Sequence, residues 1–231
     1  MSPGNHRHLW AIVLAEGEET LRGALEALTP LVPANHIRVV VNNHRRWWES
    51  ELSHHLRRNV IVQPSDCGTA AGILLPLLDI LKRDREADIL VIPPEYDVDK
   101  EKDIESALAH AASAVRGSTN RIVLLGNTPN TLDWESFIIA TSGTTLLRLY
   151  AQKAPHLLKP FLLTLSDRQE SWSGKALAGI YDTLPRLNFS KAILEQSEEY
   201  LWILPVLANK NHCKVREPSL SLTPCAGFAG L

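Results

Sequence analysis

Three glutamates, Glu16, Glu18 and Glu19, follow an apolar run at residues 11–14. A turn between a buried strand and a helix often binds phosphate, because helix N-terminal N–H groups face the ligand and the helix dipole favours negative charge. Carboxylates in such a turn oppose phosphate, since two like charges about 5 Å apart repel by about 3 kcal/mol at an effective dielectric constant of about 20. We therefore expect these acids to face solvent near a helix N-terminus, where they favour the macrodipole.

Histidines and cysteines are the other candidates for chemistry. His54 and His55 are adjacent, so on a helix they point in different directions and make a poor metal pair. Cys67, Cys213 and Cys225 lie far apart and are odd in number, which argues against a disulfide framework and against a zinc site. Cys67 also has no nearby histidine in the sequence that would activate it as a nucleophile.

Composition and charge narrow the class of protein. The 231 residues suffice for one large domain, which we expect over residues 1–206, with a loosely ordered tail over 207–231. A formal net charge of -2 gives no basic footprint of the kind that nucleic-acid binding needs, so we expect no nucleic-acid partner. The N-terminal apolar run is too short for a signal-peptide core, and no later run is long enough to span a membrane, so we expect a cytoplasmic protein.

Short apolar runs alternate with amphipathic segments through the first half of the chain. Runs apolar on both faces are typical of parallel strands covered on both sides, and their alternation with helices predicts a doubly wound, mainly parallel α/β sheet. The predicted strands are 9–14, 37–41, 60–62, 89–92, 122–125, 136–140 and 200–204, and the predicted helices are 20–28, 44–56, 69–81, 102–115, 145–152, 155–163 and 175–184.

Residues 59–81 carry a more specific pattern, a strand that runs through Gln63-Pro64 and Gly68-Thr69 into a helix. This segment resembles the mannose-1-phosphate guanylyltransferases, a branch of the sugar nucleotidyltransferases. The resemblance extends over about residues 9–206, with further matches at 31–33, 37–41, 44–48, 121–126, 128–129, 184–185, 188–190 and 204–206. It implies a GT-A-like, Rossmann-like fold in which Gln63, Pro64, Gly68 and Thr69 contact the guanine of GTP or GDP-mannose. The competing interpretation is that Gly68 and Thr69 only form a tight turn and a helix start.

The chain departs from the family pattern at its phosphate, metal and sugar sites. The glycine-rich phosphate loop and its Pro-Lys pair are missing after Leu14, and Glu95 stands where the family has an aspartate that holds Mg²⁺. A longer carboxylate could still bind this hard cation, but the second metal ligand has no counterpart after Val206. The lysine that binds the sugar phosphate in the family is also absent, and Glu135 replaces an asparagine that recognises the sugar. Lys153 and Lys175 could supply positive charge in principle, but we expect both on helix surfaces. Asp97 and Asp99 are expected to be solvated acids at the start of a helix.

Three hypotheses follow from these departures. The first is a pseudoenzyme that keeps the fold and part of a guanine pocket and acts as a nucleotide-sugar-binding or regulatory module, docking on an active nucleotidyltransferase subunit. The second is an active guanylyltransferase that makes GDP-mannose from GTP and mannose 1-phosphate, with Mg²⁺ held by Glu95. The third is a folded remnant without a ligand. Several independent losses in one chain favour the first hypothesis.

Overall fold

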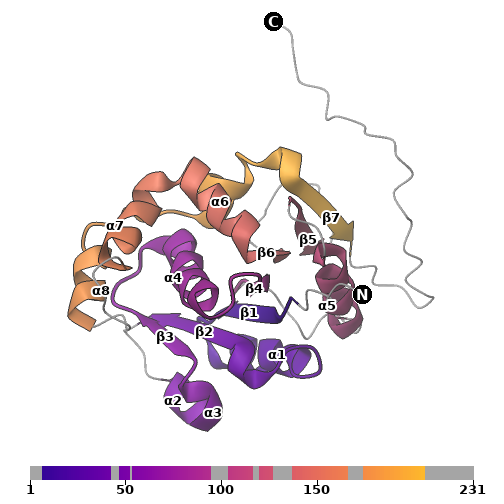
Figure 1. The fold of residues 1–231 in the computed structure, drawn as a ribbon. Helices are drawn as coiled ribbons and strands as arrows, with labels where there is room; N and C mark the ends of the chain where they lie inside the picture. The colour runs from indigo at the N-terminus through magenta and orange to yellow at the C-terminus, as the bar shows by residue number, and fades with distance from the viewer. Residues whose placement is uncertain are drawn as a thin grey trace, which may run out of the picture.

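The computed structural model describes residues 7–42, 47–52, 54–94, 104–116, 120–126, 137–165 and 174–205. Within them lies one seven-stranded sheet with the strand order β3-β2-β1-β4-β6-β5-β7 and helices on both faces (Figure 1). This arrangement confirms the doubly wound, mainly parallel α/β prediction. The predicted tail, residues 207–231, and the domain boundary at residue 206 lie outside the described residues.

Parallel strands form the first half of the sheet. β1 (Leu9–Leu14) lies between β2 (Ile37–Asn42) and β4 (Asp88–Ile92), and β3 (Val60–Gln63) pairs with β2. The side chains of β1, β2 and β4 are mostly buried on both faces, as the continuous apolar runs predict, whereas three of the four residues of β3 are partly buried. All four strands therefore end at the same edge of the sheet.

One strand of the second half runs in the opposite direction. β6 (Ile138–Ser142) is antiparallel to both β4 and β5 (Ile122–Gly126), and β7 (Leu201–Pro205) pairs in parallel with β5 at the sheet edge. The sequence predicts these three strands within two residues of their bounds. Strand direction does not follow from an apolar run, because both pairing modes bury the same residues here.

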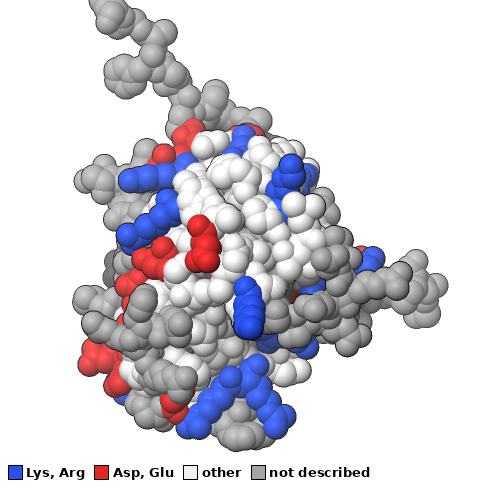
Figure 2. All heavy atoms as spheres, turned by 90° about the vertical axis from the view of Figure 1, so that its left-hand side faces the viewer, with Lys and Arg blue, Asp and Glu red and all other residues white. Residues whose placement is uncertain are grey.

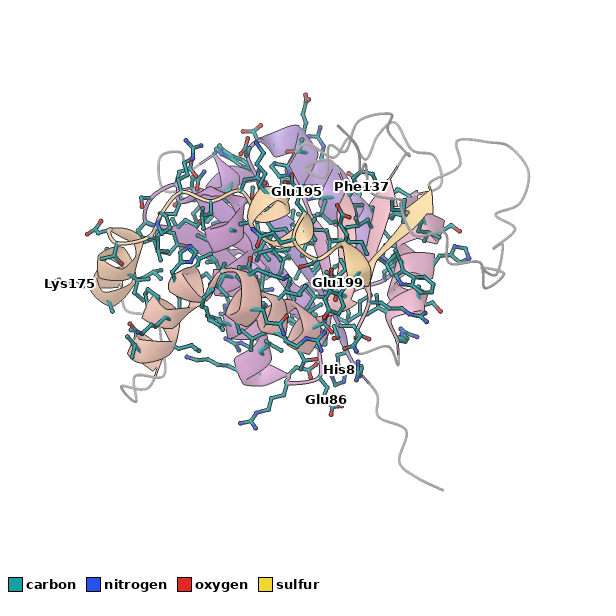
Figure 3. The ribbon with its side chains drawn as sticks, turned by 90° about the horizontal axis from the view of Figure 1, so that it is seen from above. His8, Glu86, Phe137, Lys175, Glu195 and Glu199 are labelled. Atoms are coloured by element: carbon teal, nitrogen blue, oxygen red, sulfur yellow. The ribbon has the colours of Figure 1, made fainter. Side chains whose placement is uncertain are left out.

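Two apolar clusters separate the sheet from its helices. One face packs on α4 (Gly68–Arg83), α6 (Gly143–Lys153), α7 (Pro155–Leu165) and α8 (Gly174–Tyr181). The other face packs on α1 (Glu18–Leu28), α2 (Trp48–Glu51), α3 (His54–Arg57) and α5 (Ile104–Val115). Two short 3-10 helices, Ala34–His36 and Glu198–Tyr200, and a short π-helix, Ser190–Leu194, complete the described elements. Side chains fill the space between the layers (Figure 3).

The predicted helix over residues 44–56 is wrong in its length. The structure has two short helices, α2 and α3, and Leu52 between them has an extended backbone with φ -90° and ψ 132°. This conformation places the Leu52 side chain in the core with 2 % exposure, so burial of an apolar group interrupts the helix. Trp47 and Trp48 pack half-buried against the same cluster.

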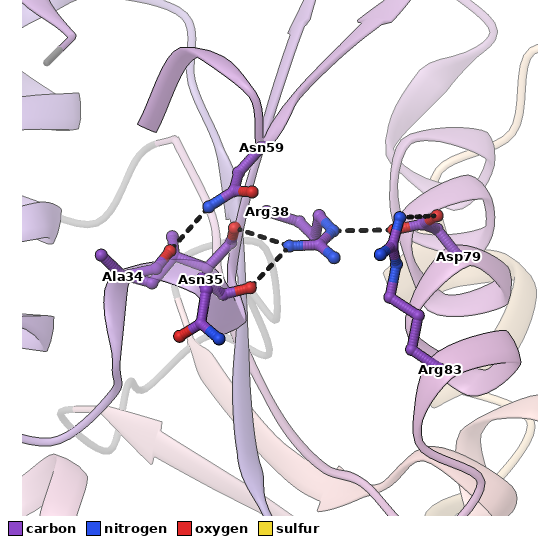
Figure 4. A network of polar contacts seen from close by, with 7 residues as sticks. Ala34, Asn35, Arg38, Asn59, Asp79 and Arg83 are labelled. Carbon is purple, nitrogen blue, oxygen red and sulfur yellow. Dashed lines mark hydrogen bonds and ion pairs between the residues drawn. The ribbon is translucent and has the colours of Figure 1, made fainter. Parts of the chain in front are cut away.

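A polar network fastens β2 to α4 at the N-terminal end of the strands (Figure 4). The buried Arg38 donates from Nε to Asp79 Oδ2 at 2.8 Å and from Nη1 to the carbonyl oxygens of Asn35 and Ile37. Its guanidinium lies 4.9 Å from the ring centre of Trp10, which also stacks on His36 at 4.2 Å. The buried charge thus has several partners, which a buried charge requires.

Candidate functional site

A pocket of about 410 Å³ opens where β1, β2 and β3 end and α4 begins. In doubly wound folds the carboxyl ends of the strands leave such a crevice, because the connections diverge to opposite faces of the sheet. Its lining residues come from strand ends, the α4 N-terminus and a late loop: Leu14, Ala15, Glu16, Val40, Asn42, Gln63, Asp66, Gly68, Thr69, Gly72, Pro94, Arg186, Leu187 and Asn188.

Backbone geometry fixes the start of α4 beside the loop that carries Leu187. Gly68 has φ +81°, and a Cβ there would overlap the Leu187 carbonyl, whose carbon would lie only 2.8 Å away. The two segments are joined by hydrogen bonds from Leu187 N to Cys67 O, from Ala70 N to Leu187 O and from Phe189 N to Thr69 Oγ1. The interpretation of Gly68 and Thr69 as a tight turn and helix start therefore accounts for both residue types by geometry.

Side-chain amides form one wall of the pocket. Gln63, at the end of β3, donates from Nε2 to Asn42 Oδ1 at 3.3 Å and accepts from the Tyr181 hydroxyl at 3.3 Å. Burial, with a smaller effect of Cys67, raises the pKa of Tyr181 far above its ordinary value, so this hydroxyl stays protonated and donates. Gly72 leaves room for the amide, since a Cβ there would lie 3.3 Å from Gln63 Nε2. The amide of Gln63 is thus held in one orientation at the pocket wall.

The connection between β1 and α1 is only three residues long, from Ala15 to Gly17. Glu16 is exposed and lines the pocket, while Glu18 and Glu19 are exposed in the first turn of α1. This confirms the expected place of Glu18 and Glu19 near a helix N-terminus and shows that Glu16 faces the pocket as well. A connection of this length has no space for a loop that would wrap a triphosphate.

One cation lines the pocket in the part of the chain that the structure describes. Arg186 forms an ion pair with Asp66, with Nη2 2.8 Å from Oδ2, and Asp66 Oδ1 accepts from the Gly68 N–H. Both side chains are well exposed, at 75 % and 43 %, so water screens the pair and its contribution to stability is small. Over the face seen in Figure 2, Lys and Arg side chains are interspersed with Asp and Glu side chains and form no broad basic patch among the described residues.

The structure brings three of the four predicted base-binding residues together. Gln63, Gly68 and Thr69 line the pocket, whereas Pro64 is not among its lining residues. The predicted metal ligand Glu95 lies outside the described residues, as do Asp97, Asp99 and Glu135. Residues 7–94, 104–126 and 137–205, apart from their undescribed gaps, contain no group of three or more His, Cys, Asp or Glu side chains that could hold a metal ion.

Other sequence candidates lie away from the pocket lining. Lys153 and Lys175 are on α6 and α8, and Lys175 lies at the edge of the molecule, as expected for helix-surface lysines (Figure 3). Cys67 is buried, and its thiol contacts the carbonyl oxygen of Tyr181 at 3.4 Å.

In the described part of the chain, no helix is long and apolar enough to cross a membrane.

Sequence reasoning missed several pocket residues. Asn42 directly follows the predicted strand 37–41, so its place at a strand end would have identified it. Asp66 lies in the turn before α4, and Gly72 faces the pocket from the first turns of that helix. Arg186 joins the pocket from about 120 residues away, and only the fold reveals that contact.

Comparison with known proteins establishes the fold but no family. No protein-family model matches the sequence, and no curated protein matches it. A structure described as mannose-1-phosphate geranyltransferase from Thermus thermophilus superposes with a TM-score of 0.68 at 17 % identity, covering 86 % of this chain and 74 % of that one. The likeness shows a shared α/β fold. A mannose-6-phosphate isomerase structure from Helicobacter pylori is also similar, with a TM-score of 0.58, 15 % identity and coverage of 86 % and 97 %.

Proposed function

We propose that this protein is a catalytically silent, nucleotidyltransferase-like module that binds a guanine nucleotide or nucleotide sugar. The observation that carries the proposal is a pocket of the size of a small-molecule site at the carboxyl ends of β1–β3, next to a β1–α1 connection of three residues. The pocket can hold a ring and offer it polar groups. The short connection removes the place where backbone amides would hold a triphosphate during transfer.

The polar groups of the pocket suit a base better than a reacting phosphate. The amides of Asn42 and Gln63 supply N–H donors and carbonyl oxygens at one wall, so they match the donors and acceptors on the edge of a heterocycle. Charge stabilisation in phosphoryl transfer needs cations or a bound metal ion aimed at the developing charge. Arg186, the lining cation in the described chain, is already paired with Asp66.

Binding without turnover fits a regulatory role. We expect the partner to be an active nucleotidyltransferase subunit, whose output would change when this chain is bound. The competing reaction, in which mannose 1-phosphate attacks the α-phosphate of GTP and pyrophosphate leaves, would need Mg²⁺ at Glu95 and a further cation at the pocket.

Titration calorimetry with GDP-mannose tests the binding claim. We expect saturable binding to the wild-type protein, and a loss of about tenfold in affinity for Asn42→Ala, because this variant removes one pocket amide and frees the Gln63 side chain. Asn59→Ala is the matched control, since Asn59 donates one hydrogen bond to Ala34 O, at the opposite end of the strands. Equal affinity in both variants, or no binding to the wild type, contradicts the proposal.

A further inference from the structure

The charges around the pocket point to the ligand chemistry that it accepts. Glu16 and Asp66 carry carboxylates and Arg186 carries a guanidinium, so the described lining has a net charge of -1. Asp66 and Arg186 neutralise each other at 2.8 Å, and Asp66 Oδ1 also accepts the Gly68 N–H. The carboxylate of Glu16 is left as the uncompensated charge among these three lining groups.

The α1 N-terminus next to Glu16 does not offset this charge. Gly17 is its N-cap and supplies no side-chain cap, and the first turn places Glu18 and Glu19, both exposed, in the positive end of the helix dipole. A phosphate chain that extends past Glu16 would therefore approach a segment that carries three carboxylates within four consecutive residues. Each added phosphate raises the repulsion, because Coulomb energy grows with the product of the charges.

The other lining groups are uncharged and complementary to a neutral ring. In the described contacts, Gln63 donates one side-chain N–H to the side-chain oxygen of Asn42 and accepts from Tyr181. The side-chain N–H groups of Asn42 and the second N–H of Gln63 therefore remain for a ligand carbonyl or ring nitrogen. Glu16 can accept from a ligand N–H. A heterocycle with a carbonyl beside an N–H, as in guanine, satisfies both kinds of group without bringing charge into the pocket.

We infer that the pocket selects an uncharged nucleoside or base over the corresponding nucleotides, and that Glu16 sets this preference. The inference rests on the proposed binding function and reverses the expectation for a nucleotidyltransferase, in which the phosphates contribute to binding. Affinity falls as ligand charge rises, from guanosine through GMP and GDP to GTP. The nucleoside end carries the binding energy, and the phosphates extend past Glu16 toward solvent.

Calorimetric titration of these four ligands, without divalent metal and at low ionic strength, tests the inference. We expect GTP to bind about tenfold more weakly than guanosine. The ratio of guanosine affinity to GTP affinity should shrink when salt is raised, because salt screens the repulsion between the phosphates and Glu16. Glu16→Gln should reduce the ratio by about threefold or more. Glu26→Gln is the control, since Glu26 is also an exposed acid, lies on α1 outside the pocket lining, and should leave the ratio unchanged.

The outcomes separate this inference from the proposed function. If GTP binds as tightly as guanosine, the inference is wrong and the binding function stands. The same conclusion follows if the ratio of guanosine affinity to GTP affinity is equal in Glu16→Gln and Glu26→Gln. Absence of binding for all four ligands overturns the binding function itself. The salt series uses only the wild-type protein, so it tests the charge argument even without a folded variant.

Discussion

The two ends of the parallel strands differ in how their polar groups are satisfied. At the N-terminal end, Arg38 is buried and bonded to Asp79 and to backbone carbonyls, and Trp10 contacts both Arg38 and His36. At the carboxyl end, the strands open onto a pocket of about 410 Å³ whose amides are partly bonded to one another. The first end holds the layers together, while the second end leaves polar groups at the wall of a pocket.

The largest effect is expected where the carboxyl end depends on close backbone packing. Gly68→Ala should lower the free energy of unfolding by about 3 kcal/mol or more, because the Cβ overlaps the Leu187 carbonyl and φ is +81°. Urea unfolding measures this change. Gly179→Ala is the control, since nothing lies within 4 Å of its Cβ and the helix should gain about 0.5–1 kcal/mol. Equal stability of both variants would show that Leu187 does not pack on α4 as described.

The N-terminal end should respond to loss of a charge partner. Asp79→Ala leaves the buried Arg38 guanidinium without its carboxylate and should cost about 2–3 kcal/mol of unfolding free energy, with little change in ligand affinity. Asp182→Ala, at an exposed position after α8, is the control and should be near neutral. A large loss of ligand affinity in folded Asp79→Ala would erase the distinction between the two ends.

A pair of tyrosine variants sharpens the same distinction. Tyr181→Phe removes the hydroxyl that donates to Gln63 Oε1, and Tyr150→Phe removes one that donates to Ala70 O at 2.7 Å. Each should cost about 1 kcal/mol of unfolding free energy, measured by chemical denaturation. Of the two variants, only Tyr181→Phe should weaken ligand binding, by about threefold to tenfold in calorimetry, because it frees the Gln63 amide. Equal ligand affinity in the two variants would mean that the orientation of Gln63 does not matter.

The smallest effect concerns the pH dependence of Asp88, at the start of β4. Burial raises the pKa of its carboxyl above the ordinary value of 3.8, although Arg7, with Nη1 3.6 Å away, opposes the change. A raised folded-state pKa means that the folded protein binds the proton more tightly, so this stabilisation is present below pH 3.8 and is lost as pH rises through the folded value. Relative to Asp88→Asn, the wild type should lose unfolding free energy as pH rises through this range, measured by urea unfolding at several pH values. Parallel pH profiles of the two unfolding free energies would contradict the assignment.

Sequence patterns predicted the sheet and most of its helices because the strands are apolar on both faces. They failed at Leu52, where a core contact interrupts a helical pattern, and they gave no direction for β6. At the site, the turn through Gln63, Gly68 and Thr69 was predicted from residues that are neighbours in the chain. The place of Arg186 at the pocket could not be predicted in this way, because its contact with Asp66 spans about 120 residues and depends on how the late loop returns to α4.

Pyrophosphate release from GTP and mannose 1-phosphate with Mg²⁺ tests the central claim most directly. With protein whose GDP-mannose binding has been verified, the account predicts no release above the rate without protein, because the three-residue β1–α1 connection provides no triphosphate site. An active guanylyltransferase assayed alongside shows that the reagents work. Release that depends on this protein and disappears in Glu95→Ala would contradict the account and establish an enzyme with a different phosphate site.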